Sequence, residues 1–203
     1  YEVDICDKKT LDKAVSDFKV RNGRLDIIVA NAGIGVGAKD GSLNFSLFEK
    51  VVDVNIKGVL HTFEIGVKNF KEGEGHLVAV SSVAAFSGLP GAGIYSASKA
   101  AVFRLCEGLS IDLKRQGINV SCICPGFIDT PLTKKNNHKM PFLMSAEKGA
   151  EKISTAILKR KNLYVFPWQM AAIMLMAEKL PRWIYRNLVL KLMSFVMPKR
   201  RDS

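Results

Sequence analysis

Short apolar runs alternate with longer segments of amphipathic spacing along most of the chain. Four runs predict buried strands, at residues 25–30, 76–82, 118–124 and 163–166. Helical spacing lies between them, at about residues 9–21, 46–70, 94–116 and 145–160. Strands that are separated by helices pair in parallel through right-handed crossover connections. The pattern therefore predicts one open α/β sheet with helices packed against it.

The chain beyond Pro167 is apolar and basic at the same time. Residues 168–177 carry no charge, and aromatic and aliphatic side chains then alternate with Arg and Lys. A membrane span needs about 18–20 uncharged apolar residues, whereas the longest uncharged run that reaches this C-terminal part, residues 162–177, is shorter and contains a proline. The pattern predicts two amphipathic helices, which lie on an anionic membrane surface or pack at a dimer interface or in the core. We divide the chain into an α/β domain, residues 1–167, and a basic helical extension, residues 168–203.

Charge is distributed unevenly along a chain of otherwise ordinary composition. The 203 residues are 48% hydrophobic and 24% charged, which excludes a disordered or low-complexity protein. Residues 1–133 carry 15 Lys/Arg and 15 Asp/Glu, and residues 134–203 carry 15 and 4, so the C-terminal third holds the whole net charge of +11. No base-reading motif accompanies these cations, which argues against nucleic acid as a partner.

The cysteines and histidines predict no metal centre. Four cysteines are too few for a disulfide framework and favour a reducing, cytoplasmic compartment. Cys122 and Cys124 lie in an apolar run with no histidine nearby, where free cysteine acts as a small hydrophobic residue. We expect His61 in the core, and His76 and His138 at the surface.

Candidate chemistry gathers where the predicted strands end. Tyr95 and Lys99 are four residues apart in a helical segment, so both side chains share one face. A phenol has a pKa of about 10, and a neighbouring ammonium lowers it, which makes the pair a candidate general acid/base. Ser82 ends the preceding strand, and Asn55 lies inside a helix, where Asn is unfavourable without a partner. Because ligands of open α/β sheets bind outside the carboxyl ends of the strands, these side chains can share one crevice.

In order and spacing, these motifs resemble the short-chain dehydrogenase/reductase superfamily. The resemblance extends from Asp4 to about Phe166 and rests on Asn31-Ala32-Gly33, Asn55, Ser81-Ser82, Tyr95-x-x-x-Lys99 and Pro125-Gly126-x-x-x-Thr130. It implies a doubly wound parallel sheet, the NAD(P)-binding Rossmann fold. It also implies an oxidoreductase that interconverts a ketone and a secondary alcohol.

The resemblance further implies a role for each matching residue. Tyr95 would exchange a proton with the substrate oxygen, and Ser82 would hydrogen-bond and polarise that oxygen. Lys99 would lower the Tyr95 pKa and bind the nicotinamide ribose, while Asn55 would hold a water that links Lys99 to solvent. Expected contacts to NADP, which we favour over NAD, come from the adenine-side pair Asp4 and Ile5, from Asn31, Ala32 and Gly33, and from Pro125, Gly126, Ile128 and Thr130 around the nicotinamide.

Two departures from the family pattern stand out. Ala30 occupies the place of an Asn that usually precedes Asn-Ala-Gly. The first strand, the glycine-rich turn and the first helix of the family have no counterpart, and with the next strand and helix they amount to roughly 55 residues. Without its neighbour, the strand at residues 25–30 would expose an apolar edge. We therefore expect the gene product to be longer than these residues.

Substrate and partners are predicted more coarsely. The apolar, basic extension favours a lipophilic substrate, such as a 3-oxoacyl chain, a keto-lipid or a steroid-like ketone. Family members commonly form homodimers or homotetramers, and the helices at residues 46–70 and 94–116 would supply the interface. The extension adds a possible peripheral membrane contact. The alternative is a non-catalytic binding or scaffold protein that has kept the fold.

Overall fold

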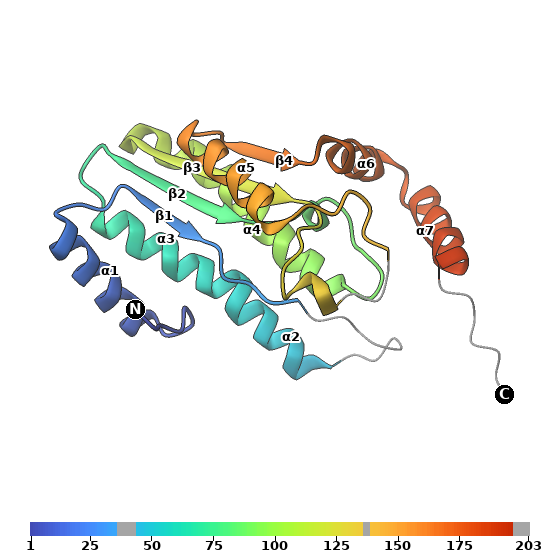
Figure 1. The fold of residues 1–203 in the computed structure, drawn as a ribbon, viewed down its shortest axis with the longest axis horizontal. Helices are drawn as coiled ribbons and strands as arrows, with labels where there is room; N and C mark the ends of the chain where they lie inside the picture. The colour runs from blue at the N-terminus through green and yellow to red at the C-terminus, as the bar shows by residue number, and fades with distance from the viewer. Residues whose placement is uncertain (36–43, 136–138, 197–203) are drawn as a thin grey trace.

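Four parallel strands form the centre of the fold, in the order β1-β2-β3-β4 (Figure 1). The computed structural model describes residues 1–35, 44–135 and 139–196. The strands are β1 (Ile27–Ala30), β2 (Gly75–Val80), β3 (Ile118–Pro125) and β4 (Leu163–Phe166), and each pairs in parallel with the next. The four predicted strands are confirmed, and β2 ends two residues earlier than expected, so Ser81 and Ser82 follow it.

Helices cover both faces of this sheet, as a doubly wound fold requires. Alternate residues of β2 and β3, among them Leu77 and Val120, pack against α3 (Gly58–Asn69) and α4 (Gly93–Asp112) on one face. Val78 and Ile123 point to the other face, where they pack against α5 (Ala146–Leu158). The two central strands, β2 and β3, are thus buried on both sides, which explains their continuous apolar sequence.

Of the remaining helices, α1 (Lys8–Asn22) and α2 (Phe45–Val52) lie beside α3, and α6 (Trp168–Lys179) and α7 (Arg182–Val196) lie beyond the carboxyl end of β4 (Figure 1). Helix α1 packs along α3, and α2 leads into α3. The extension forms α6 and α7, the two helices that the sequence predicts. In the part of the chain that the structure describes, no helix is both long and apolar enough to cross a bilayer. His138 and residues 197–203 lie outside the described residues.

The segment at residues 46–70 differs from the single regular helix expected there. A π-helical turn, Asp53–Lys57, joins α2 to α3, and the Gly58 amide donates to the Asp53 carbonyl five residues earlier. Such a turn widens the helix by one residue and is frequent at functional sites. Its centre is Asn55, which has no exposed surface.

His76 is buried, and the expectation that it lies at the surface is wrong. Its side chain is 1% exposed on the α5 side of β2, and its Nε2 lies 2.7 Å from the Ser121 hydroxyl of β3. The hydrogen bond satisfies the ring, and burial lowers the pKa of this histidine. His61 is partly buried on α3, and its Nδ1 lies 3.1 Å from the Ile5 carbonyl.

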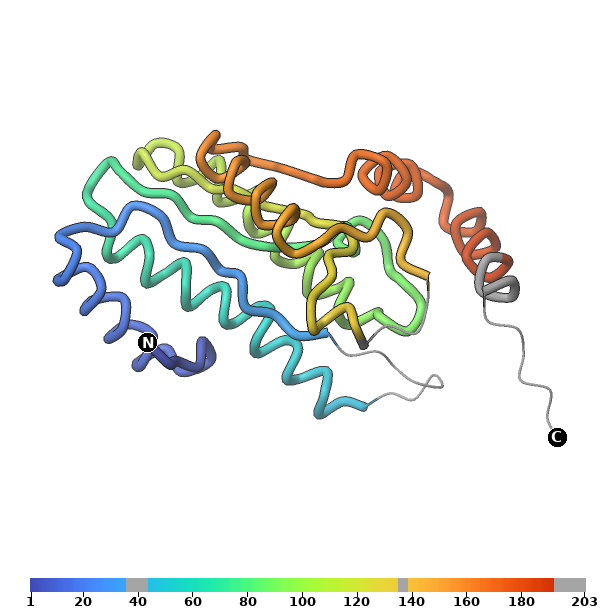
Figure 2. Tube along the Cα trace, in the orientation of Figure 1, coloured from blue at the N-terminus to red at the C-terminus, as the bar shows by residue number. Residues whose placement is uncertain are grey.

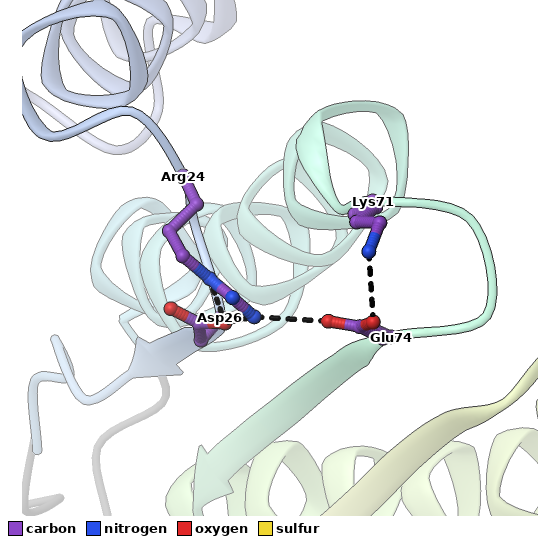
Figure 3. A network of polar contacts seen from close by, with 4 residues as sticks. All are labelled: Arg24, Asp26, Lys71 and Glu74. Atoms are coloured by element: carbon purple, nitrogen blue, oxygen red, sulfur yellow. Dashed lines mark hydrogen bonds and ion pairs between the residues drawn. The ribbon is translucent and has the colours of Figure 1, made fainter.

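Exposed ion pairs lie at the amino-terminal end of the sheet, where β1 and β2 begin. Glu74 accepts from Arg24 at 2.9 Å and from Lys71 at 3.1 Å, and Arg24 also pairs with Asp26 (Figure 3). A cleft of about 400 Å³ lies beside this network and is lined in part by His76 and Arg160. Because these ion pairs are solvent-exposed, each contributes little to stability.

Candidate active site

The amino-terminal turns of α4 bring Tyr95 and Lys99 together at the carboxyl end of the sheet. The Lys99 ammonium lies 5.8 Å from the centroid of the Tyr95 ring, one helical turn away. Ser82 follows β2, and its hydroxyl lies near enough to the Tyr95 side chain to oppose the rise in the pKa of that phenol. Its own hydroxyl also accepts from the Ala84 amide at 3.1 Å, which caps a short 3₁₀ turn and fixes the serine. The structure thus gathers these three predicted side chains in one place.

Asn55 joins the loop after β1 to helix α4. Its Oδ1 accepts from the Ile34 amide at 2.8 Å, and its Nδ2 donates to the Ile34 carbonyl at 2.9 Å. The same Nδ2 donates to the Ser98 hydroxyl at 3.0 Å, and Ser98 in turn donates to the Tyr95 carbonyl at 2.8 Å. The side chain therefore positions two backbone segments at once. A water bound near Asn55 stays a prediction.

Lys99 is a nearly buried cation. Its Nζ donates to the Val80 carbonyl at 2.9 Å, at the last residue of β2. Burial lowers its pKa from 10.5 to about 8, and the thiols of Cys122 and Cys124 act weakly in the other direction. A deprotonated fraction is thus accessible near neutral pH, which an exposed lysine does not offer.

The Tyr95 pKa departs from the sequence-based expectation. Burial raises it above its ordinary value, and the hydrogen bond from Ser82 is what opposes this rise. The expected lowering by Lys99 is not present in this arrangement, because the ammonium is turned toward the Val80 carbonyl. A bound hydrogen-bond acceptor that drew the Lys99 ammonium away from the Val80 carbonyl and toward Tyr95 would lower the Tyr95 pKa.

Two glycines let the loop after β1 approach these side chains closely. A Cβ at Gly33 would lie 3.3 Å from the Lys99 Nζ and 3.4 Å from the Asn55 Oδ1. A Cβ at Gly35 would lie 3.3 Å from Leu132 and 3.7 Å from the Tyr95 ring. Side chains at these positions would fill the space beside the tyrosine and the lysine. Asn31 and Ala32 precede this loop and are exposed.

The adenine-side pair lies against the start of α3. Ile5 packs so closely on Gly58 that a Cβ there would lie 2.3 Å from its Cδ1. Asp4 is exposed, and its carboxylate accepts from the Cys6 amide at 2.9 Å. Since Gly58 is three residues beyond Asn55, Ile5 lies against the helix that carries Asn55.

The segment after β3 carries the predicted contacts to the nicotinamide. The Gly126 amide donates to the Phe166 carbonyl at 2.7 Å, which continues the sheet beyond Pro125. The Thr130 amide donates to the Thr133 hydroxyl at 3.0 Å. The Ile128 side chain packs against Gly149 of α5, so a contact with a carboxamide would have to come from its backbone.

Ser98 and Ile34 were not predicted as residues of the site, and both connect through Asn55 as described. Ser81, which belongs to the matching Ser81-Ser82 motif, donates to the Lys99 carbonyl at 2.8 Å. Serine inside a helix competes for backbone hydrogen bonds, so Ser98 in the interior of α4 was a readable sign of a local partner. The role of Ile34 rests on its backbone and leaves no trace in its side chain.

Comparisons with known proteins identify the family to which the chain is similar. The model of the short chain dehydrogenase family matches residues 1–141. An uncharacterized oxidoreductase of Myxococcus xanthus (strain DK1622) is 36% identical over 185 residues, which are 91% of this chain and 73% of the relative.

Two solved structures give the same answer. A short chain dehydrogenase from Burkholderia cenocepacia J2315 in complex with NADP is 26% identical, with a TM-score of 0.70 over 81% of this chain and 72% of that one. A 3-ketoacyl-ACP reductase from Sinorhizobium meliloti 1021 is 28% identical, with a TM-score of 0.69 over 81% of this chain and 76% of that one. With its parallel sheet and the matched family motifs, the chain belongs to the short-chain dehydrogenase family and is an oxidoreductase of that type.

Proposed function

We propose that the protein interconverts a ketone and a secondary alcohol with NAD(P) as the hydride carrier. The observation that carries this proposal is the convergence of the Tyr95 phenol, the Ser82 hydroxyl and the Lys99 ammonium at the end of β2. A phenol and a hydroxyl that bind the same substrate oxygen, beside a buried cation, can polarise a carbonyl and deliver a proton to its oxygen.

The residues present fit the nicotinamide end of such a cofactor. Among the described residues, the Val80 carbonyl accepts one hydrogen of the Lys99 ammonium, and the other two can reach ribose hydroxyls. Gly33 and Gly35 keep side chains out of the space beside Lys99 and Tyr95. When bound, the cofactor supplies or accepts the hydride. Similarity to the NADP-bound Burkholderia structure supports NADP over NAD.

Each side chain of this chain then has a defined task. The Ser82 hydroxyl donates to the substrate oxygen and orients the carbonyl. Tyr95 gives its proton to that oxygen in reduction and takes it back in oxidation. Lys99 stabilises the phenolate that results, because a positive charge nearby favours the ionised form. Asn55 holds the loop at Ile34 and the helix at Ser98 in register, so the three groups stay aligned.

We propose a lipophilic substrate and a homo-oligomeric protein. Leu132, Phe142 and Leu143 expose apolar side chains on the segment that follows Thr130, and the 3-ketoacyl-ACP reductase is among the similar structures.

Exposed Leu60 on α3 and Ile111 on α4 support self-association through these helices, as a homodimer or homotetramer. Reducing conditions suit its free cysteines, which supports a cytoplasmic location.

Replacement of Tyr95 by Phe tests the proposal. The ring stays and the exchangeable proton goes, so we expect kcat on a panel of lipophilic ketones to fall by roughly 10²–10⁴-fold. Cofactor binding, read by energy transfer from Trp168 and Trp183 to reduced nicotinamide, should persist, and NADPH should bind more tightly than NADH.

Tyr164→Phe is the matched control, since Tyr164 lies on β4 and stacks on Phe166 in the core. It should leave turnover unchanged. If Tyr95→Phe turns over ketone at the original rate, the catalytic assignment is wrong. If the unaltered protein binds neither NADPH nor NADH, the non-catalytic alternative replaces the enzyme.

A further inference from the structure

Helix α6 is apolar on the face that it buries and on the face that it exposes. Met170 is buried, and Met174 packs against the main core. On the other side Trp168, Leu175 and Met176 are exposed, and their spacing of seven and eight residues places them on one face. A helix that is apolar all round is normally covered on both sides.

Helix α7 continues this exposed apolar face with cations at its borders. Trp183 and Leu190 are exposed and seven residues apart, so they share one face of the helix. Arg186 and Lys191 lie to either side of that face by the helical periodicity. Tyr185 points to the protein instead, and its hydroxyl donates to the Gly88 carbonyl at 2.7 Å. The helix is therefore held by one side while the other side faces outward.

The charged residues of these two helices are mostly cations. Residues 168–196 contain Lys179, Arg182, Arg186 and Lys191 but a single carboxylate, Glu178, and Glu178 pairs with Arg104 of α4 at 3.3 Å. We call the exposed apolar residues of both helices together with these four cations the α6–α7 surface, that is Trp168, Leu175, Met176, Trp183, Leu190, Lys179, Arg182, Arg186 and Lys191.

We propose that the α6–α7 surface docks on an anionic lipid bilayer. Tryptophan and aliphatic side chains bordered by Arg and Lys match the apolar boundary and the negative headgroups of such a bilayer. A second copy of the chain fits less well, because a two-fold contact would set this cationic surface against itself. Both helices are too short to span the bilayer, so the contact is peripheral.

This surface lies at the end of the sheet that holds the candidate active site. β4 ends at Phe166, and α6 begins two residues later, at the same end of the molecule where α4 starts (Figure 2). Gly88, the anchor of Tyr185, belongs to the segment between Ser82 and Tyr95. Docking would thus bring the candidate active site near the bilayer. This further step rests on the proposed function: the substrate would be a ketone dissolved in the membrane.

The two tryptophans of the chain make a selective test possible, because both belong to the α6–α7 surface. The whole protein is mixed with vesicles of phosphatidylcholine alone or with about one-third phosphatidylserine, and its intrinsic fluorescence and co-sedimentation are measured. We expect a blue shift and pelleting with the anionic vesicles, reversal at high salt, and neither with neutral vesicles.

A charge-matched pair of variants localises the contact. The double variant Arg182→Gln/Arg186→Gln keeps both tryptophans and should lower the partition coefficient by roughly thirtyfold. Lys9→Gln/Lys13→Gln removes the same charge from exposed positions of α1 and should leave binding unchanged. Equal losses in both variants would overturn the proposal, since net charge rather than this surface would then account for binding.

Other outcomes distinguish a failure of the docking proposal from a failure of the proposed function. A blue shift that grows with protein concentration without vesicles would assign the surface to a second copy and refute the bilayer. An absent shift with anionic vesicles, in a protein that reduces a water-soluble ketone, would refute the surface and keep the proposed function. Vesicle binding by a protein that reduces no ketone would keep the surface and refute the enzyme.

Discussion

At the scale of single residues, Lys99 is held where a positive charge is unfavourable. Lys99 is 6% exposed, and its ammonium donates to the Val80 carbonyl. Burial disfavours the charged form, which is why the pKa falls to about 8. The same burial keeps the ammonium beside Tyr95 rather than in solvent.

Lys99 should make stability rise with pH between about 8 and 10.5. In this range the folded protein has released the Lys99 proton, whereas the unfolded chain, with a pKa of 10.5, still binds it. The unfolded state binds more protons, so the free energy of unfolding increases with pH, by at most about 3 kcal/mol. Urea unfolding of the unaltered protein and of Lys99→Met at several pH values measures this, and identical pH dependence in both would contradict it.

Asn55 should tolerate even a near-isosteric change poorly. In Asn55→Asp the carboxylate still accepts from the Ile34 amide but can no longer donate to the Ile34 carbonyl or to Ser98. A buried charge and two unpaired acceptors should cost about 2–5 kcal/mol of unfolding free energy. Asn162→Asp, at an exposed position, should cost little in the same denaturation experiment. Equal losses of unfolding free energy in the two variants would show that the hydrogen bonds of Asn55 do not account for its effect on stability.

At the scale of elements, the helices and strands followed from apolar periodicity, because most are amphipathic or bury two faces. The π-helical turn did not follow, because its cause is remote. The apolar pattern of residues 46–70 is continuous, while the Ile34 backbone to which Asn55 binds lies 21 residues earlier in the chain. Asn55 itself was conspicuous, as a poor helix former inside a helix, yet its partner could only come from the tertiary structure.

Two turn glycines should differ in how they respond to alanine. Both have positive φ, 78° at Gly23 and 72° at Gly117, so either substitution should cost about 1 kcal/mol of backbone strain. At Gly117 the new Cβ would also lie 2.3 Å from the Gly73 carbonyl oxygen, whereas nothing lies within 4 Å at Gly23. Thermal unfolding should therefore show a larger loss for Gly117→Ala than for Gly23→Ala, and equal losses would rule out the close contact.

At the scale of the whole molecule, the sheet, its layers and the grouping of Ser82, Tyr95 and Lys99 could be predicted from the sequence. They follow from strand ends and helical spacing, which are local. The buried place of His76 could not, since its partner Ser121 comes from a neighbouring strand. Nor could the Tyr95 pKa, which depends on the depth of burial and on where the Lys99 ammonium points.

The hydrogen bonds of Asn55 have a consequence for the order of assembly. They connect segments that are 21 and 43 residues apart in the chain, and so need β1, the π-helical turn and α4 to be docked together. Local helices form early in folding, whereas contacts between distant segments form late. The alignment of the candidate catalytic groups is thus a property of the completed fold, and a chain with its helices already formed would still lack it.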